Sequence, residues 1–136
     1  MINLKKYNIS ILVVEDNPID TLVFQALLQP YFNLVTVTNG FDALKKIEEV
    51  KFDLILMDIN LGNIDMDGSK VMKTIRRSKK HKDVKIYAVT SYPDDVAFFT
   101  EQGFDDLYVK PVIKEEIFEF INKHLSLSFP EVYHNH

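Results

Sequence analysis

Short apolar runs rich in β-branched residues alternate along the chain with longer stretches in which apolar residues recur at helical spacing. The short runs predict five strands, at residues 9–14, 33–37, 53–57, 84–89 and 107–109. The longer stretches predict five helices, one after each strand. This alternation indicates an α/β fold in which helices cover both faces of a parallel sheet. Because crossovers between parallel strands are right-handed, the doubly wound class is the favoured topology.

Local signals mark the ends of several helices. Asn17 and Pro18 supply a cap residue and a proline at the first helical position. Ser91 followed by Asp94 is typical of a capping box, and it predicts a helix that ends at Gly103.

Apolar spacing also predicts which helix faces are buried. In the first helix the predicted buried positions are Ile19, Leu22, Val23, Ala26 and Leu27. In the last helix they are Ile113, Ile117, Phe120 and Ile121.

Composition narrows the class of protein. The 136 residues fit one domain, and 46% hydrophobic with 26% charged residues is typical of a soluble globular protein. No apolar run reaches the roughly 18 residues of a membrane-spanning helix, and the N-terminus lacks the apolar segment of a secretory signal. We therefore expect no membrane insertion. The absence of cysteine excludes disulfides and thiol catalysis and suits a cytoplasmic location.

The net charge of −4 argues against general nucleic-acid binding, so no direct DNA binding is expected. Half of the 16 basic residues, however, cluster in one segment: Lys70, Lys73, Arg76, Arg77, Lys79, Lys80, Lys82 and Lys85. Such a cluster could contact phosphate backbones. No aromatic or recognition motif accompanies it, so we favour a solvated helix face whose cations complement the helix dipole.

Polar residues with complementary chemistry follow the predicted strands. Glu15 and Asp16 follow the first strand, Asp58 the third, Thr90 the fourth and Lys110 the fifth. Ligand sites of doubly wound folds lie outside the carboxyl ends of the strands, so these side chains should converge. Each has a structural explanation by itself, such as a helix cap or a solvated lysine before a proline. Their joint convergence favours a functional site.

Three clustered carboxylates repel one another, and Mg²⁺ relieves that repulsion because it binds one or two carboxylates together with waters and phosphate oxygens. A carboxylate such as that of Asp58 can attack phosphorus and form an acyl phosphate. Catalysis is then mostly positioning and charge stabilisation. Lys110 could bind one phosphoryl oxygen, and the Thr90 hydroxyl could donate to another.

The segments VVEDN, LMDIN, AVTSY and YVKP resemble, in order, the four motif positions of response regulator receiver domains. The resemblance covers about residues 9–125. It implies that Asp58 is the phosphoacceptor, that Glu15 and Asp16 are the acidic pair, and that Thr90 and Lys110 are the switch hydroxyl and the phosphate-binding lysine. The backbone carbonyl of Asn60 corresponds to the position that completes the Mg²⁺ shell.

The resemblance further implies a flavodoxin-like five-stranded sheet of order 2-1-3-4-5 with five helices. Residues 1–125 would form the receiver domain and 126–136 a C-terminal tail. The implied phosphodonor is a histidine kinase or a histidine phosphotransfer protein. The implied output is contact with a downstream protein, with a homodimer as an option, through the fourth helix, fifth strand and last helix. Phe98, Tyr108 and Phe118 are candidate exposed aromatics on that face, with core packing as the alternative.

The sequence departs from the family pattern at three places. The loop INLGNIDMDG after Asp58 places its Asp-Gly two residues late. Leu107 stands where an aromatic switch residue is common, and Tyr108 beside it should point to the other face of the sheet. We expect the Thr90 hydroxyl to move on phosphorylation, with the coupled aromatic rotation either absent or replaced by another movement. Tyr92 lies near the expected route of the hydrolytic water and could lengthen the lifetime of an acyl phosphate.

Other functions remain open on the residues alone. A haloacid-dehalogenase-type phosphatase usually carries a second acid two residues after its nucleophile, where this chain has Asn60. A nucleotide or flavin site needs a glycine-rich loop, whereas the first turn reads EDNPID. The retained alternative is a receiver-like module that binds partners without phosphorylation. The favoured interpretation is a signalling phosphoacceptor, not an enzyme, that catalyses only its own phosphorylation and dephosphorylation.

Overall fold

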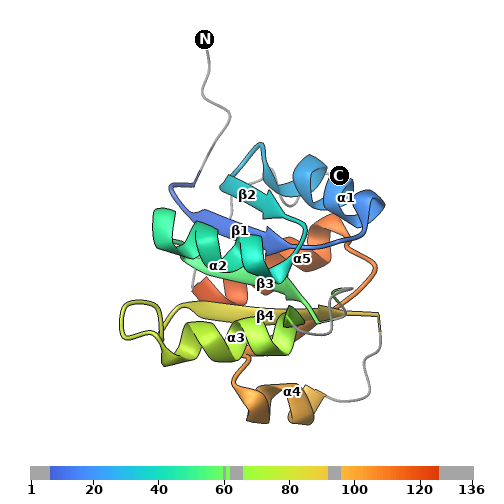
Figure 1. The fold of residues 1–136 in the computed structure, drawn as a ribbon. Helices are drawn as coiled ribbons and strands as arrows, with labels where there is room; N and C mark the ends of the chain where they lie inside the picture. Colours follow the sequence, from blue (N-terminus) through green and yellow to red (C-terminus); the bar gives the residue numbers. More distant parts are fainter. Residues whose placement is uncertain (1–6, 60, 62–65, 92–95, 126–136) are drawn as a thin grey trace.

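The computed structural model describes residues 7–59, 61, 66–91 and 96–125, in which strands and helices alternate (Figure 1). The strands are β1 (Ser10–Val14), β2 (Asn33–Val37), β3 (Leu54–Asp58), β4 (Lys85–Thr90) and β5 (Asp106–Val109). The helices are α1 (Pro18–Leu28), α2 (Gly40–Glu49), α3 (Gly68–Arg77), α4 (Val96–Gln102) and α5 (Lys114–Leu125). Within these residues, no helix combines the length and apolarity needed to span a membrane.

The strands form one parallel sheet in the order β2-β1-β3-β4-β5, which confirms the predicted doubly wound fold. The chain leaves β1 for β2 on one side and later returns to β3 on the other. The carboxyl ends of β1 and β3 therefore flank the point where the strand order reverses, which is where doubly wound folds place their ligand sites.

Alternate strand residues supply two apolar layers because successive side chains point to opposite faces of the sheet. Leu12 and Ile55 pack in the layer shared with α2 and α3, whereas Val13 and Leu56 pack in the layer shared with α1 and α5. Figure 1 shows the two helix sets on opposite sides of the sheet. Every residue of β3 is buried, so the residue at its end is held by a rigid central strand.

The predicted helix ends agree with the structure where they can be compared. Asn17 caps α1 and accepts hydrogen bonds from two backbone amides of the first turn, at 2.9 and 3.1 Å. Gly103 follows α4 with φ of 129°, a conformation that favours glycine. The predicted capping box includes Asp94, which lies outside the described residues.

The predicted buried stripe of α1 is largely wrong, although Leu27 is partly buried against the core. Ile19 and Leu22 are 71% and 64% exposed, and the fully buried residues are Phe24 and Leu28. This helix is apolar on more than one side, so helical spacing alone permits two stripes. Packing against the sheet selects the one that carries the aromatic ring.

The predicted stripe of α5 is confirmed in part. Ile117 and Ile121 are fully buried, but Ile113 is 41% exposed because the helix begins one residue later. The structure also buries Phe118, which packs edge-on against Tyr31.

Two of the three candidate exposed aromatics are buried instead. Tyr108 and Phe118 are 4% and 1% exposed because α5 covers this face of β5, whereas Phe98 on α4 is 53% exposed as predicted. The core-packing alternative therefore holds for Tyr108 and Phe118.

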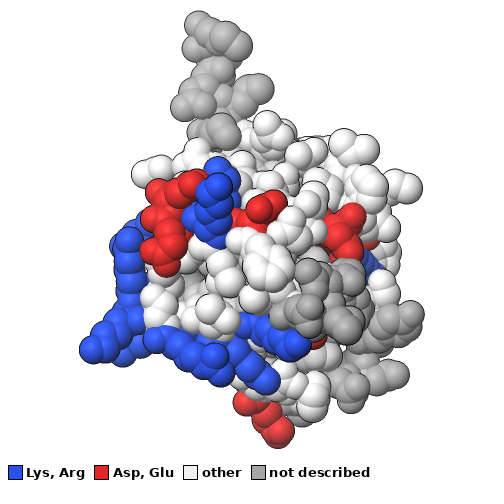
Figure 2. Space-filling model, in the orientation of Figure 1, with Lys and Arg blue, Asp and Glu red and all other residues white. Residues whose placement is uncertain are grey.

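The basic segment is largely a solvated face, as expected, with one exception. Figure 2 shows basic side chains along the side of the molecule where α3 and the following connection lie. Arg76 is only partly exposed, and it is hydrogen-bonded to the backbone carbonyls of Lys82 and Gly103 and pairs with Asp105 at 2.7 Å. Arg76 thus ties the end of α3 to the residues that lead into β4 and β5.

Candidate functional site

The predicted site residues meet at the edge of the sheet formed by the C-terminal ends of the strands, here called the carboxyl edge. Glu15 and Asp16 follow β1, Asp58 ends β3, Thr90 ends β4 and Lys110 follows β5. Within the described part of the chain, the buried polar or charged residues are Glu15, Asp58 and Thr90, which are 1%, 5% and 1% exposed. Burial of polar groups is costly, so their concentration at one edge indicates a functional role.

Three carboxylates form the core of the site. Glu15, Asp16 and Asp58 each place an oxygen within 4.8 Å of the others. Asp16 is exposed while the other two are buried, so the cluster opens to solvent on one side. Oxygen-only donors in this arrangement fit a hard divalent cation such as Mg²⁺, which keeps part of its water shell. The predicted fourth contributor, Asn60, lies outside the described residues.

The electrostatics of Glu15 reflect this crowding. Burial raises its pKa to about 7, and a hydrogen bond with Asp58 acts in the same direction, against the opposing effect of Lys110. Without a cation, Glu15 therefore holds its proton to a higher pH than an exposed glutamate does. A divalent cation would displace that proton, because metal ligands bind in their ionised form.

Lys110 provides the positive charge of the site. Its Nζ lies 2.9 Å from Oε1 of Glu15, 2.8 Å from Oδ2 of Asp20 and 3.9 Å from Oδ2 of Asp58. Burial acts to lower the pKa of Lys110, but the hydrogen bonds to Asp20 and Glu15 outweigh it and raise the pKa. The ammonium group is therefore charged and lies beside the carboxylate of Asp58.

The backbone fixes Lys110 relative to Thr90. The amide of Lys110 donates to the carbonyl of Thr90 at 2.7 Å, and Thr90 pairs with Val109 across the two strands. The predicted hydroxyl and the predicted lysine thus lie on adjacent strand ends.

Gly68 contributes through close packing. A Cβ at this position would lie 2.5 Å from the backbone oxygen of Asp58 and 2.9 Å from Cα of Ile59. The first turn of α3 therefore packs directly on the backbone of Asp58, and only glycine permits this approach. The sequence identifies Gly68 as a turn residue but does not indicate this contact.

Asp20 is the charged partner that sequence reasoning missed. It lies in the first turn of α1, where an acidic residue is usually explained by the helix dipole. Its contact with Lys110 joins residues 90 positions apart, so no local pattern predicts it.

Leu107 and Tyr108 are successive residues of β5 and lie on opposite faces of the sheet. Leu107 lies in the layer with α2 and α3, whereas Tyr108 lies in the opposite layer, where its hydroxyl accepts a hydrogen bond from the Ile113 amide at 3.2 Å. The predicted opposite orientation of Leu107 and Tyr108 is therefore confirmed. Tyr92, the third departure from the family pattern, lies outside the described residues.

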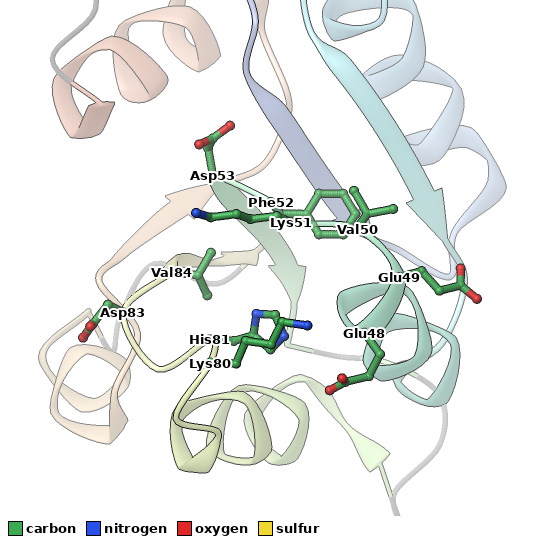
Figure 3. A pocket seen from close by; sticks show the side chains of 10 residues that line it. All are labelled: Glu48, Glu49, Val50, Lys51, Phe52, Asp53, Lys80, His81, Asp83 and Val84. Atoms are coloured by element: carbon green, nitrogen blue, oxygen red, sulfur yellow. The ribbon is translucent and has the colours of Figure 1, made fainter.

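A cavity of about 640 Å³ lies at the opposite edge of the sheet, here called the amino edge (Figure 3). The end of α2 and the segments that lead into β3 and β4 line it, with acids such as Glu48 and bases such as Lys80 and His81. The charges have both signs and come from exposed segments. This cavity does not provide the convergent buried acids of the carboxyl edge.

Comparison with known proteins agrees with the motif resemblance. The family model of the response regulator receiver domain matches residues 11–122. Over 124 residues the chain is 30% identical to the sensor histidine kinase GacS of Pseudomonas protegens. The aligned segment covers 87% of this chain and 13% of that protein. The chain spans only 13–20% of the length of the first curated relatives that it matches.

Two solved structures are similar in both sequence and fold. The receiver domain of the sensor histidine kinase PA1611 from Pseudomonas aeruginosa is 27% identical, with a TM-score of 0.79 and coverage of 89% of this chain and 100% of that chain. Its crystal structure has a magnesium ion in the active-site cleft. The response regulator TrrA of Thermotoga maritima, in complex with Mg²⁺-BeF, is 33% identical, with a TM-score of 0.70. The match covers 84% of this chain and 96% of that chain.

Proposed function

The chain belongs to the response regulator receiver domain family of two-component signalling, and from that premise we propose that Asp58 accepts a phosphoryl group in a Mg²⁺-dependent reaction. Receiver domains are signalling phosphoacceptors that histidine kinases or phosphotransfer proteins phosphorylate. The observation that carries the proposal is the convergence of Glu15, Asp16 and Asp58 with Lys110 at the carboxyl edge.

In the proposed reaction a carboxylate oxygen of Asp58 attacks the phosphorus of a phosphohistidine. An O–P bond forms, the N–P bond breaks, and its electron pair leaves with the imidazole nitrogen of the donor. Hydrolysis of the acyl phosphate later returns the carboxylate and inorganic phosphate. The chain in this account catalyses only its own phosphorylation and dephosphorylation.

The protein contributes orientation and charge. Bound Mg²⁺, held by Glu15, Asp16 and Asp58 with the Asn60 carbonyl, would supply positive charge against the phosphoryl oxygens. Lys110 supplies a second positive charge beside Asp58. The Thr90 hydroxyl is proposed to donate a hydrogen bond to a phosphoryl oxygen once the group is in place.

The output is proposed to be contact with a downstream protein through α4, β5 and α5, with Phe98 as its exposed aromatic residue. Phosphorylation would shift the population of two forms of this face. A homodimer through the same face, the division into residues 1–125 and 126–136, and a cytoplasmic location stay predictions.

Intact mass after incubation with acetyl phosphate, with and without Mg²⁺, tests the proposed chemistry. We expect a gain of one phosphoryl group that requires Mg²⁺, is lost in Asp58→Asn and is retained in Asp83→Asn, whose acid lies at the amino edge. If neither acetyl phosphate nor a phosphorylated histidine donor gives this gain, a module that binds partners without phosphorylation becomes the better account.

A further inference from the structure

Lys110 has a closer partner than the proposed acceptor. Its Nζ lies 2.8 Å from Asp20, within hydrogen-bond distance, and 3.9 Å from Asp58, beyond it. The Lys110 side chain is 14% exposed and that of Asp20 is 31% exposed, so the pair is shielded from much of the solvent. An ion pair in such a setting orients the lysine more effectively than a fully exposed pair.

The capping of α1 does not explain Asp20. Asn17 already accepts hydrogen bonds from the backbone amides of Ile19 and Asp20. The Asp20 carboxylate instead accepts a hydrogen bond from Lys110, outside its own helix. Asp20 is also not one of the three acids whose oxygens cluster within 4.8 Å.

The other two partners of Lys110, Glu15 and Asp58, are also candidate ligands of a cation. Glu15 and Asp58 belong to the carboxylate cluster that fits a divalent cation, so a cation draws their charge away from the lysine. Asp20 keeps its charge available to Lys110. A lysine ammonium has three donors, and bonds to Glu15 and Asp20 leave one for an oxygen near Asp58.

We propose that Asp20 is a positioning residue that anchors Lys110, so that the ammonium group stays beside Asp58 and donates its remaining hydrogen to a phosphoryl oxygen there. This inference rests on the proposed function. The 3.9 Å separation from Asp58 leaves the lysine near a phosphoryl group attached to that carboxylate. Without the anchor, the Lys110 side chain would be less firmly oriented, and its ammonium group would lie beside the phosphoryl group for a smaller share of the time.

The first test uses trifluoroberyllate as a phosphoryl analogue at saturating Mg²⁺, with binding followed by fluorine NMR. We expect Asp20→Asn to weaken binding of the analogue by about three- to tenfold, the size of one partly shielded ion pair. Asp20→Glu should recover part of the loss because it restores the charge.

The matched control is Asp42→Asn. Asp42 lies three residues after the cap Asn39 in α2, as Asp20 lies three residues after Asn17 in α1. Asp42 bonds to its own cap residue and not to the site, so its substitution should leave analogue binding unchanged. Equal losses in the two variants would overturn the proposal, because they would indicate a general helix-end effect.

A double-mutant cycle separates positioning from a structural effect. In a Lys110→Ala background, Asp20→Asn should cause little further loss of analogue binding, since its effect passes through the lysine. If Asp20→Asn weakened analogue binding by the same factor in both backgrounds, the proposal would be contradicted. Thermal unfolding without metal or analogue gives a second readout. The effects of the two substitutions on the unfolding midpoint should be non-additive by about 2 °C or more.

The outcomes distinguish the two proposals. If the wild type binds the analogue and Asp20→Asn matches it, the anchoring role fails while the proposed function stands. If the wild type binds no analogue and gains no phosphoryl group, both fail.

Discussion

The two edges of the sheet use charge in opposite ways. At the carboxyl edge, Glu15 and Asp58 are buried side by side, and one lysine serves three carboxylates. At the amino edge, Arg76 satisfies several carbonyls and one acid, and His124 pairs with Asp106 at 2.8 Å. The amino edge is arranged for stability. The carboxyl edge keeps a surplus of negative charge that a cation and a phosphoryl group can use, and such arrangements are typical of functional sites.

The largest expected effect comes from the lysine of the carboxyl edge. Lys110→Ala should slow phosphorylation by about 100-fold, because it removes the fixed positive charge beside Asp58. Lys80→Ala, at the amino edge, should leave the rate unchanged. Rates of phosphoryl incorporation from acetyl phosphate measure both, and equal rates in the two variants would contradict the division of roles.

The next effect concerns Arg76 at the amino edge. Arg76→Ala should lower the free energy of unfolding by about 2–3 kcal/mol, because the Lys82 and Gly103 carbonyls and Asp105 lose their partner. Urea denaturation measures this loss. The phosphorylation rate of the folded fraction should stay within about twofold of wild type, and a much larger fall would place Arg76 in the functional machinery.

Gly68 links stability to the site. Gly68→Ala should cost about 1–3 kcal/mol, because the added methyl group meets backbone atoms of Asp58 and Ile59. Unlike Arg76→Ala, it should also weaken Mg²⁺ binding, since it displaces the acceptor. Mg²⁺ titration calorimetry beside urea denaturation tests this, with Ser69→Ala as a control. Unchanged Mg²⁺ affinity would argue against tight coupling between α3 and Asp58.

The smallest expected effect is a pH dependence from Glu15. Its pKa is raised from 4.5 to about 7, so the folded state binds more protons than the unfolded state between these values. The associated stability is present below about pH 4.5 and is lost as the pH rises through about 7.

Without metal, wild type should therefore lose stability more steeply than Glu15→Gln as the pH rises across this range. Urea denaturation at several pH values measures the difference, with Glu48→Gln at the amino edge as the control. If the free energy of unfolding changed with pH in the same way for wild type and Glu15→Gln, the pH dependence could not be assigned to Glu15.

The sequence could predict the features that depend on local pattern and strand order. Asn17 is identified as a cap by its neighbour Pro18, and Asp58 is placed by the continuous apolar run before it. The convergence of strand ends then follows from the parallel sheet.

Features that depend on tertiary packing could not be predicted. The α1 sequence permits more than one apolar stripe, and only the sheet determines that Phe24 is buried while Ile19 is exposed. Asp20 resembles an ordinary first-turn acid until β5 brings Lys110 to it. The close approach at Gly68 likewise depends on how α3 docks on β3.

The most direct test of the central claim locates the phosphoryl group on the chain. After phosphorylation with Mg²⁺ and acetyl phosphate, borohydride reduction converts an aspartyl phosphate to homoserine, which peptide mass spectrometry identifies. We expect reduction at Asp58 and at no other acid of the carboxyl edge. The assignment of Asp58 would be contradicted by an acyl phosphate on Glu15, Asp16 or Asp20. It would also be contradicted by a phosphoryl group on a hydroxyl or a histidine.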